Sequence, residues 1–214
     1  ASSPFANFDT FGWRWSQDLS LDENLLRLAL LARFNSIKVA NYTAGRCSSM
    51  MCRPPRKNGS ELEVEVVGFG INAPPRFSRN QDPFAGIRPF SRKEPPQNEI
   101  HSEMSIIGRC AREGISVKGS WFYVALPPCW ECCKALVAAG VARVLFKGKG
   151  RKAEATVEVE TKEKVFAEAH GVAWEYAGFS LEREEYLDEM WEKYKKDSGL
   201  DRAAVKAKES HAPV

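Results

Sequence analysis

The chain has 214 residues, of which 43% are hydrophobic and 28% are charged, and these proportions are typical of a globular protein with a sizeable core. A formal net charge of +3 is too small to indicate, by itself, a dedicated nucleic-acid binder. The sequence lacks the run of about 18 apolar residues that a membrane-spanning helix needs, and its aromatic N-terminus does not resemble a secretory signal. Three of the six cysteines fall within residues 129–133, which suits a metal or redox site better than a disulfide framework, so we expect a reducing, cytoplasmic location.

The first expected helix covers residues 21–34 and follows an irregular arm, residues 1–19, that is aromatic and polar without periodicity. Ser20 and Glu23 form a capping box ahead of this helix, because each side chain can accept a hydrogen bond from the other residue's backbone N–H. Leucine and alanine lie on nearly every side of the segment, which predicts a helix buried over most of its surface.

Two strands and a long loop should come next. Residues 45–52 form a short candidate strand, and residues 61–70 alternate Glu with Val and Leu, the period-two pattern of a strand with one exposed face. The intervening RPPRKNGS predicts a turn. Residues 78–97 are rich in Pro, Arg and Phe, and a loop of that length is usually functional or disordered.

The second half of the chain alternates helices and strands, which indicates a layered α/β domain. Pro128 suits the first turn of one helix, and Ser180 caps the last one, whose aromatic residues at helical spacing should dock on the body or on another subunit. The expected helices cover residues 98–113, 128–139, 161–171 and 181–197, and the expected strands cover residues 121–126, 142–147 and 172–177.

Two short motifs place metal-binding side chains at the starts of two of these helices. Cys129 and Cys132 are three residues apart, hence on one helix face, and the positive end of the helix dipole favours their thiolates. Helical residues two apart point about 200° away from each other. His101 and Glu103 can therefore share a site only if His101 lies at the helix entry, with Asn98 as its cap.

One imidazole and two thiolates would leave one position of a tetrahedral zinc open, which indicates a catalytic site rather than a structural one. Zinc brings the pKa of a bound water down toward about 7, and Glu103, a carboxylate that does not bind the metal, would carry the released proton. His-x-Glu with Pro-Cys-x-x-Cys is the established signature of zinc deaminases. Buried core cysteines and a capping histidine would explain either motif alone, but not both together.

These motifs and their surroundings resemble the cytidine deaminase superfamily, most of all its deoxycytidylate (dCMP) deaminase branch, over residues 22–177. LLRLALLARFNS is similar to the first helix of that branch, GINAPPRF to its Asn-Gly-x-Pro-Arg-Gly turn, IHSEMSII to its His-Ala-Glu-Met segment, and FYVALPPCWECCKALVAAGVARVLF to its Pro-Cys-x-x-Cys segment. The resemblance implies a three-layer α/β/α cytidine-deaminase-like fold with a five-stranded mixed sheet. We expect an N-terminal arm over 1–19, the deaminase domain over 20–178, and a charged helix and tail over 179–214.

The resemblance also implies hydrolytic deamination of a cytosine nucleotide or nucleoside, with dCMP to dUMP as the first choice. Zinc hydroxide would attack C4 while Glu103 shuttles protons to N3 and to departing ammonia. Asn72 takes a sugar- or base-contacting position, or is only a turn residue; Arg76 could meet a 5′-phosphate, or is only a solvated arginine. Ala125 stands at a substrate-lining position where the branch usually has Thr.

Two further hypotheses compete with a free-nucleotide deaminase. An enzyme that edits cytosine or adenine within RNA or single-stranded DNA would use the basic segment 143–152 and the Arg-rich loop 76–93 as a path for the strand. A non-catalytic partner subunit is disfavoured, because a structural zinc does not need Glu103. We expect zinc as cofactor, a homo-oligomer, and no membrane partner.

Three other residues have simpler expected roles. Cys133 should be a small buried side chain. His170, just before a helix-ending glycine, should interact with the helix C-terminus. Trp130 either lines the substrate pocket, which we favour slightly, or packs beneath its helix.

Overall fold

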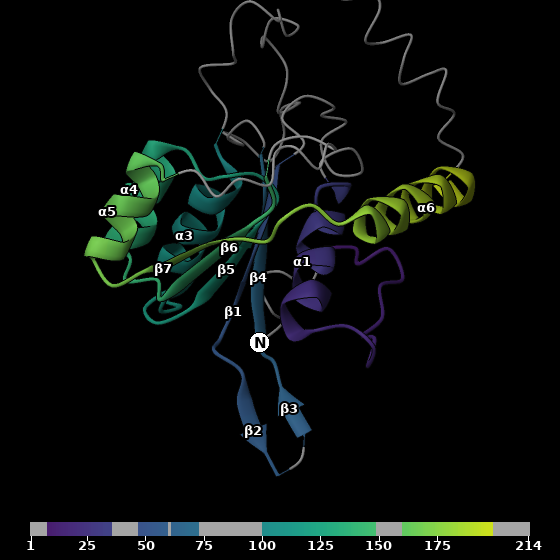
Figure 1. Ribbon diagram of the computed structural model, residues 1–214, viewed down its shortest axis with the longest axis horizontal. Helices are drawn as coiled ribbons and strands as arrows, with labels where there is room; N and C mark the ends of the chain where they lie inside the picture. Colours follow the sequence, from purple (N-terminus) through teal and green to yellow (C-terminus); the bar gives the residue numbers. More distant parts are fainter. Residues whose placement is uncertain (1–7, 36–46, 60, 73–99, 149–159, 199–214) are drawn as a thin grey trace, which may run out of the picture.

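A five-stranded mixed sheet lies between two layers of helices in the computed structural model of the chain (Figure 1). The structure describes residues 8–35, 47–59, 61–72, 100–148 and 160–198. This arrangement confirms the three-layer α/β/α fold expected from the sequence (Figure 1). Among the described helices, none is both long and apolar enough to cross a membrane.

The sheet has the strand order β4-β1-β5-β6-β7. The second strand in this order, β1, runs antiparallel to both β4 and β5, whereas β5, β6 and β7 run parallel to one another. All five residues of β1 are buried, as expected for a strand covered by helices on both faces. The strands are β1 (Ser48–Cys52), β4 (Val66–Ile71), β5 (Trp121–Val124), β6 (Arg143–Phe146) and β7 (Ala173–Tyr176).

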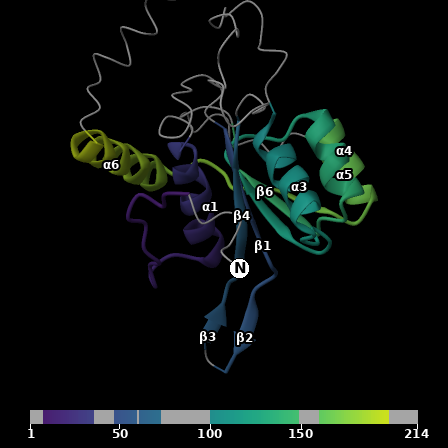
Figure 2. The same cartoon turned by 180° about the vertical axis from the view of Figure 1, so that it is seen from behind.

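Figures 1 and 2 show how the helices divide between the two faces of the sheet. One layer holds α3 (Ser102–Glu113), α4 (Trp130–Ala138) and α5 (Lys162–Ala169). The other holds α1 (Leu21–Ala32) and α6 (Leu181–Ser198). Because α4 links β5 to β6 and α5 precedes β7, the crossovers between the parallel strands all use the first layer.

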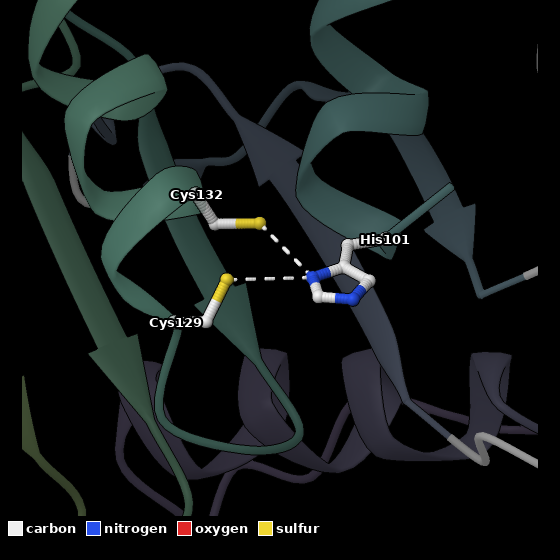
Figure 3. A group of neighbouring side chains, drawn as sticks. All are labelled: His101, Cys129 and Cys132. Atoms are coloured by element: carbon white, nitrogen blue, oxygen red, sulfur yellow. Dashed lines mark hydrogen bonds between the residues drawn. The ribbon is translucent and has the colours of Figure 1, made fainter. Parts of the chain in front are cut away.

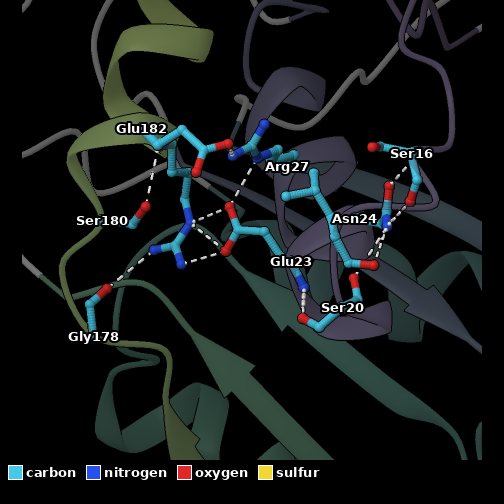
Figure 4. Close-up of polar contacts among 10 residues, drawn as sticks. Ser16, Ser20, Glu23, Asn24, Arg27, Gly178, Ser180 and Glu182 are labelled. Atoms are coloured by element: carbon cyan, nitrogen blue, oxygen red, sulfur yellow. Dashed lines mark hydrogen bonds and ion pairs between the residues drawn. The ribbon is translucent and has the colours of Figure 1, made fainter.

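The first helix begins after Ser20, as predicted, and the Ser20 hydroxyl accepts a hydrogen bond from the Glu23 amide at 3.1 Å. This is one half of the expected capping box, because the Glu23 carboxylate bonds Arg27 and Arg183. Every residue from Asn24 to Ala32 is buried, which confirms the expectation of a helix covered on most sides. Asn24 also bonds both backbone groups of Ser16, and so fixes the N-terminal arm to the helix (Figure 4).

The terminal helix docks on the body, as its aromatic spacing predicts. Trp191 of α6 stacks on Phe34 with ring centroids 4.6 Å apart, and Tyr194 meets Phe11 of the N-terminal arm edge-on at 4.7 Å. Ser180 caps the helix by accepting the Arg183 amide at 3.2 Å. Ion pairs between α1 and α6, among them the pair of Glu23 and Arg183, complete this contact (Figure 4).

Two sequence-based boundaries near the first strands are wrong. Residues 61–70 do not form one strand: they divide into β3 (Glu61–Glu63) and the start of β4, and β3 pairs with β2 (Arg56–Asn58) in a hairpin beyond the main sheet (Figure 1). The expected turn shrinks to the hairpin tip, where Gly59 adopts a positive φ of 64° after an asparagine, a favoured hairpin sequence. The loop expected over 78–97 lies outside the described residues.

Candidate metal centre

The structure brings together the three side chains that the sequence suggested as metal ligands (Figure 3). The His101 Nδ1 atom lies 3.5 Å from the Cys129 sulfur and 3.4 Å from the Cys132 sulfur. All three ligand atoms fall within 4.8 Å of one another. In the described parts of the chain this is the sole group of three such side chains.

These separations fit one tetrahedral zinc ion. Ligand nitrogen and sulfur atoms at about 2.0 and 2.3 Å from a tetrahedral zinc lie roughly 3.6 Å apart, close to both observed nitrogen–sulfur distances. One imidazole and two thiolates are ligands that zinc prefers, and a set of three leaves a fourth position for water or substrate. The geometry therefore suits a catalytic zinc centre.

Both ligand-bearing helices begin later than predicted, and the shift is what forms the site. The segments 98–113 and 128–139 were expected to be helical, but α3 begins at Ser102 and α4 at Trp130. His101 and Cys129 occupy the N-cap positions in extended conformation, with ψ of 152° and 168°. An extended N-cap residue directs its side chain out of the helical frame, so His101 can share a site with Glu103. Pro128 thus lies before the helix, and Asn98 falls outside the described residues.

Glu103 lies beside the three ligands without belonging to the group. Its side chain is buried, at 3% exposure, and its carboxylate accepts a hydrogen bond from the Ser102 hydroxyl at 2.8 Å. Burial raises the pKa of the Glu103 carboxyl, and hydrogen bonds from its own backbone, from Ser102 and from the Cys132 thiol offset this only in part. A buried carboxyl with a raised pKa next to a metal centre has the properties of a proton carrier.

Burial also acts on the metal ligands. Loss of solvent raises the pKa of the Cys132 thiol, and the nearby Glu103 carboxylate raises it further. A divalent cation favours both ionised groups, since a coordinated thiol loses its proton outright. The buried sulfur and carboxylate are therefore matched to a positive ion.

The three residues expected to contact substrate have different positions. Asn72 is buried, and its side-chain oxygen accepts the Ser102 amide at 2.8 Å, so it satisfies a free N–H at the start of α3. Ala125 is buried, and its amide donates to the Ser48 carbonyl at 2.9 Å, just beyond the end of β5. Arg76 lies outside the described residues. Their contacts with substrate stay predictions.

The structure also describes Cys133, His170 and Trp130, the three residues with simpler expected roles. Cys133 is buried, and its thiol donates to the Glu163 carbonyl at 3.5 Å; His170 bonds the Phe166 carbonyl through Nδ1 at 2.7 Å, as expected at a helix end. Trp130 packs against Phe166 of α5 with ring centroids 5.1 Å apart. Its expected place in the wall of the substrate pocket stays a prediction.

Sequence reasoning missed two residues near the site. The hydroxyls of Ser49 on β1 and Ser102 on α3 lie 2.6 Å apart, and Ser102 is the donor to Glu103. The signal for Ser102 was its place between His101 and Glu103, where the resembled branch has Ala. No signal marked Ser49, because it lies 53 residues from Ser102 in the chain.

Comparison with known proteins agrees with this site. Residues 62–147 match the family model described as the cytidine and deoxycytidylate deaminase zinc-binding region. Deoxycytidylate deaminase of Enterobacteria phage T2 is 40% identical over 82 residues, 38% of this chain and 40% of that protein. Human deoxycytidylate deaminase is 30% identical over 92 residues, 39% of this chain and 47% of that protein. The chain thus spans less than half the length of these curated relatives.

Among solved structures, the dCMP deaminase of cyanophage S-TIM5 in complex with dCMP and dUMP has the same fold. The TM-score is 0.51 with 19% sequence identity, over 76% of this chain and 99% of that one. The fold and the His-Cys-Cys centre define a zinc-binding α/β/α domain. The resemblance found in the sequence is confirmed for residues 62–147, which match the zinc-binding region of the cytidine and deoxycytidylate deaminases.

Proposed function

We propose that the chain is a zinc-dependent deaminase that hydrolyses the exocyclic amino group of a cytosine nucleotide or nucleoside, with dCMP to dUMP as its reaction. One observation carries the proposal: His101, Cys129 and Cys132 converge on a single ion position, with the buried Glu103 carboxyl beside them. A non-catalytic zinc site would need the three ligands but not a buried carboxyl at its edge.

The proposed roles of the zinc ion and of Glu103 follow from their chemistry. When bound, zinc supplies a water whose pKa is lowered toward about 7 and which is therefore a nucleophile at neutral pH. Glu103 would accept one proton from that water and place it on ring nitrogen N3. It would then take the remaining proton from the same oxygen, now bonded to C4, and deliver it to the amino group, so that the C4–N bond breaks, ammonia leaves and the carbonyl forms. The balance is one water consumed, one carbonyl formed and one ammonia released.

The choice of a cytosine nucleotide rests on relatives rather than on contacts in this chain. The matched curated proteins are deoxycytidylate deaminases, and the similar fold was solved with dCMP and dUMP. Asn72, whose side-chain oxygen accepts the Ser102 amide at the start of α3, is proposed to contact the sugar or the base. Arg76 would meet the 5′-phosphate through its planar guanidinium.

Ammonia release tests the proposal directly. Purified zinc-loaded protein should release ammonia from dCMP, at a rate well above that from cytidine, deoxycytidine, CMP, adenosine or single-stranded oligonucleotides. Release from oligonucleotides alone would establish the nucleic-acid-editing alternative instead. No release from any member of the panel would contradict the proposal, and light scattering on the same sample would test the expected homo-oligomer.

A further inference from the structure

The start of α3 is packed against β4 with unusual closeness. A methyl group added at Gly70 would lie 2.0 Å from the backbone oxygen of Ser102, so only glycine allows this approach. Gly70 pairs in register with Ser49 on the neighbouring β1. The contact therefore carries the first helical residue of α3 onto the part of the sheet where Ser49 lies.

The donor and the acceptor of each hydrogen bond at this contact can be assigned. The Ser102 hydroxyl lies 2.6 Å from the Ser49 hydroxyl and 2.8 Å from Oε2 of Glu103. The Ser102 hydroxyl donates to Glu103, and the Cys47 sulfur lies 3.7 Å from the same hydroxyl. Because a hydroxyl has one proton to donate, Ser102 accepts from Ser49. Both serines are fully buried, so no water competes for these bonds.

Adjacent helical residues point about 100° apart, so neighbours in a helix do not ordinarily bond through their side chains. The bond between Ser102 and Glu103 therefore restrains the Glu103 carboxylate, because other rotamers of Glu103 would break it. One carboxylate oxygen, Oε2, is thereby committed to Ser102.

We propose that Ser102, itself oriented by Ser49, is a positioning residue that holds the Glu103 carboxylate in the orientation required for proton transfer. The inference rests on the proposed deaminase function and adds a chain of two hydroxyls that runs from β1 to the proposed proton carrier. Both serines are fully buried, so in this proposal they act on turnover through the position of Glu103.

The chain offers two matched controls. Ser48, adjacent to Ser49, is also fully buried, but its hydroxyl bonds the Ala29 carbonyl at 2.6 Å on the opposite face of the sheet. Ser120 is fully buried, and its hydroxyl bonds the Val117 carbonyl at 2.6 Å before β5. Ser48→Ala and Ser120→Ala thus remove comparable buried hydrogen bonds away from Glu103.

The test measures kcat and KM for dCMP, zinc content, thermal stability and a crystal structure for each variant. Ser102→Ala should lower kcat on the order of tenfold, since small misplacement of a catalytic group is costly, with KM and zinc content unchanged. Ser49→Ala should lower kcat in the same direction by less. Ser48→Ala and Ser120→Ala should lose stability without losing kcat.

Two results would overturn the inference while the proposed function stood: a Ser102→Ala enzyme with the kcat of the Ser120→Ala control, or a lowered kcat with the Glu103 carboxylate unmoved in the crystal. If the wild-type protein released no ammonia at all, the proposed function would fail separately. The crystal structures would then decide alone: a displaced Glu103 carboxylate in Ser102→Ala supports the positioning role, and an unmoved one rejects it.

Discussion

At the scale of single residues, Glu103 lies close to the three metal ligands but has a different proposed role, which is to carry protons rather than to bind the metal. It shares the start of α3 with His101, and its burial raises the pKa of its carboxyl. Amide replacement keeps the shape and the bond from Ser102 but removes the group that exchanges protons. This allows zinc binding and turnover to be separated by one substitution.

Glu103→Gln should retain one zinc per chain and its thermal stability, while ammonia release falls by about 10²- to 10⁴-fold, the usual contribution of a general acid–base. Zinc analysis and a turnover assay check both halves. Glu131→Gln is a suitable control, because Glu131 lies on the exposed face of α4 in an ion pair with Lys134. Turnover near the wild-type rate in Glu103→Gln would reject the assigned role.

Asn72 can be tested for two roles at once. Asn72→Ala leaves the buried Ser102 amide without its acceptor and should cost about 1–3 kcal/mol of unfolding free energy in a denaturant titration. Asn72→Asp keeps an acceptor oxygen at the helix start and should recover most of that loss. If Asn72 also holds the substrate, both variants should raise KM for dCMP; a normal KM in Asn72→Asp would leave only the capping role.

At the scale of elements, local patterns predicted which helices and strands exist, and tertiary contacts decided where they begin. The Ser20 and Thr161 caps act over three residues and are visible in the sequence. By contrast, α3 begins at Ser102 because its amide meets Asn72, which lies 30 residues earlier in the chain. The apolar spacing of α6 predicted a docked helix, but not that Glu23 and the N-terminal arm would receive it.

The contact between α1 and α6 should depend on pH. Burial alone would raise the pKa of Glu23, but hydrogen bonds from Arg183 and Arg27 outweigh it and hold the pKa below its ordinary value of 4.5. A carboxyl with a depressed folded-state pKa stabilises the fold above its ordinary pKa, and that stability is lost as pH falls through the folded-state value. Unfolding free energy should therefore decline as the pH is lowered below about 4.5.

Arg183→Met provides the matching variant. It removes the nearly buried partner of Glu23, and it should lower the unfolding free energy by on the order of 3 kcal/mol at neutral pH, as expected for a broken buried pair. The acid-dependent loss should become smaller, because the pKa of Glu23 then moves back toward its ordinary value. An unchanged slope of unfolding free energy against pH in Arg183→Met would show that other carboxylates dominate. Met is chosen because it retains packing volume.

At the scale of the whole molecule, an ion bound at the metal centre would cross-link the starts of helices α3 and α4. His101 lies at the start of α3, and both cysteines lie at the start of α4. An ion held by all three side chains therefore cross-links His101 to residues that lie 28 and 31 positions later in the chain. Binding of this kind stabilises the native state only, since the unfolded chain does not assemble the site.

Zinc removal should therefore lower the melting temperature, and added zinc should restore it. At a free zinc concentration about 1,000 times the Kd, the stabilisation amounts to about 4 kcal/mol. Cys132→Ser should abolish both the bound zinc and the effect of a chelator on melting. Cys133→Ala is the matched control: this neighbouring thiol is also buried but bonds the Glu163 carbonyl rather than a metal, so the variant should bind zinc and respond to a chelator as the wild type does. A wild-type melting temperature that is indifferent to chelator and to zinc would mean that the three side chains do not share an ion.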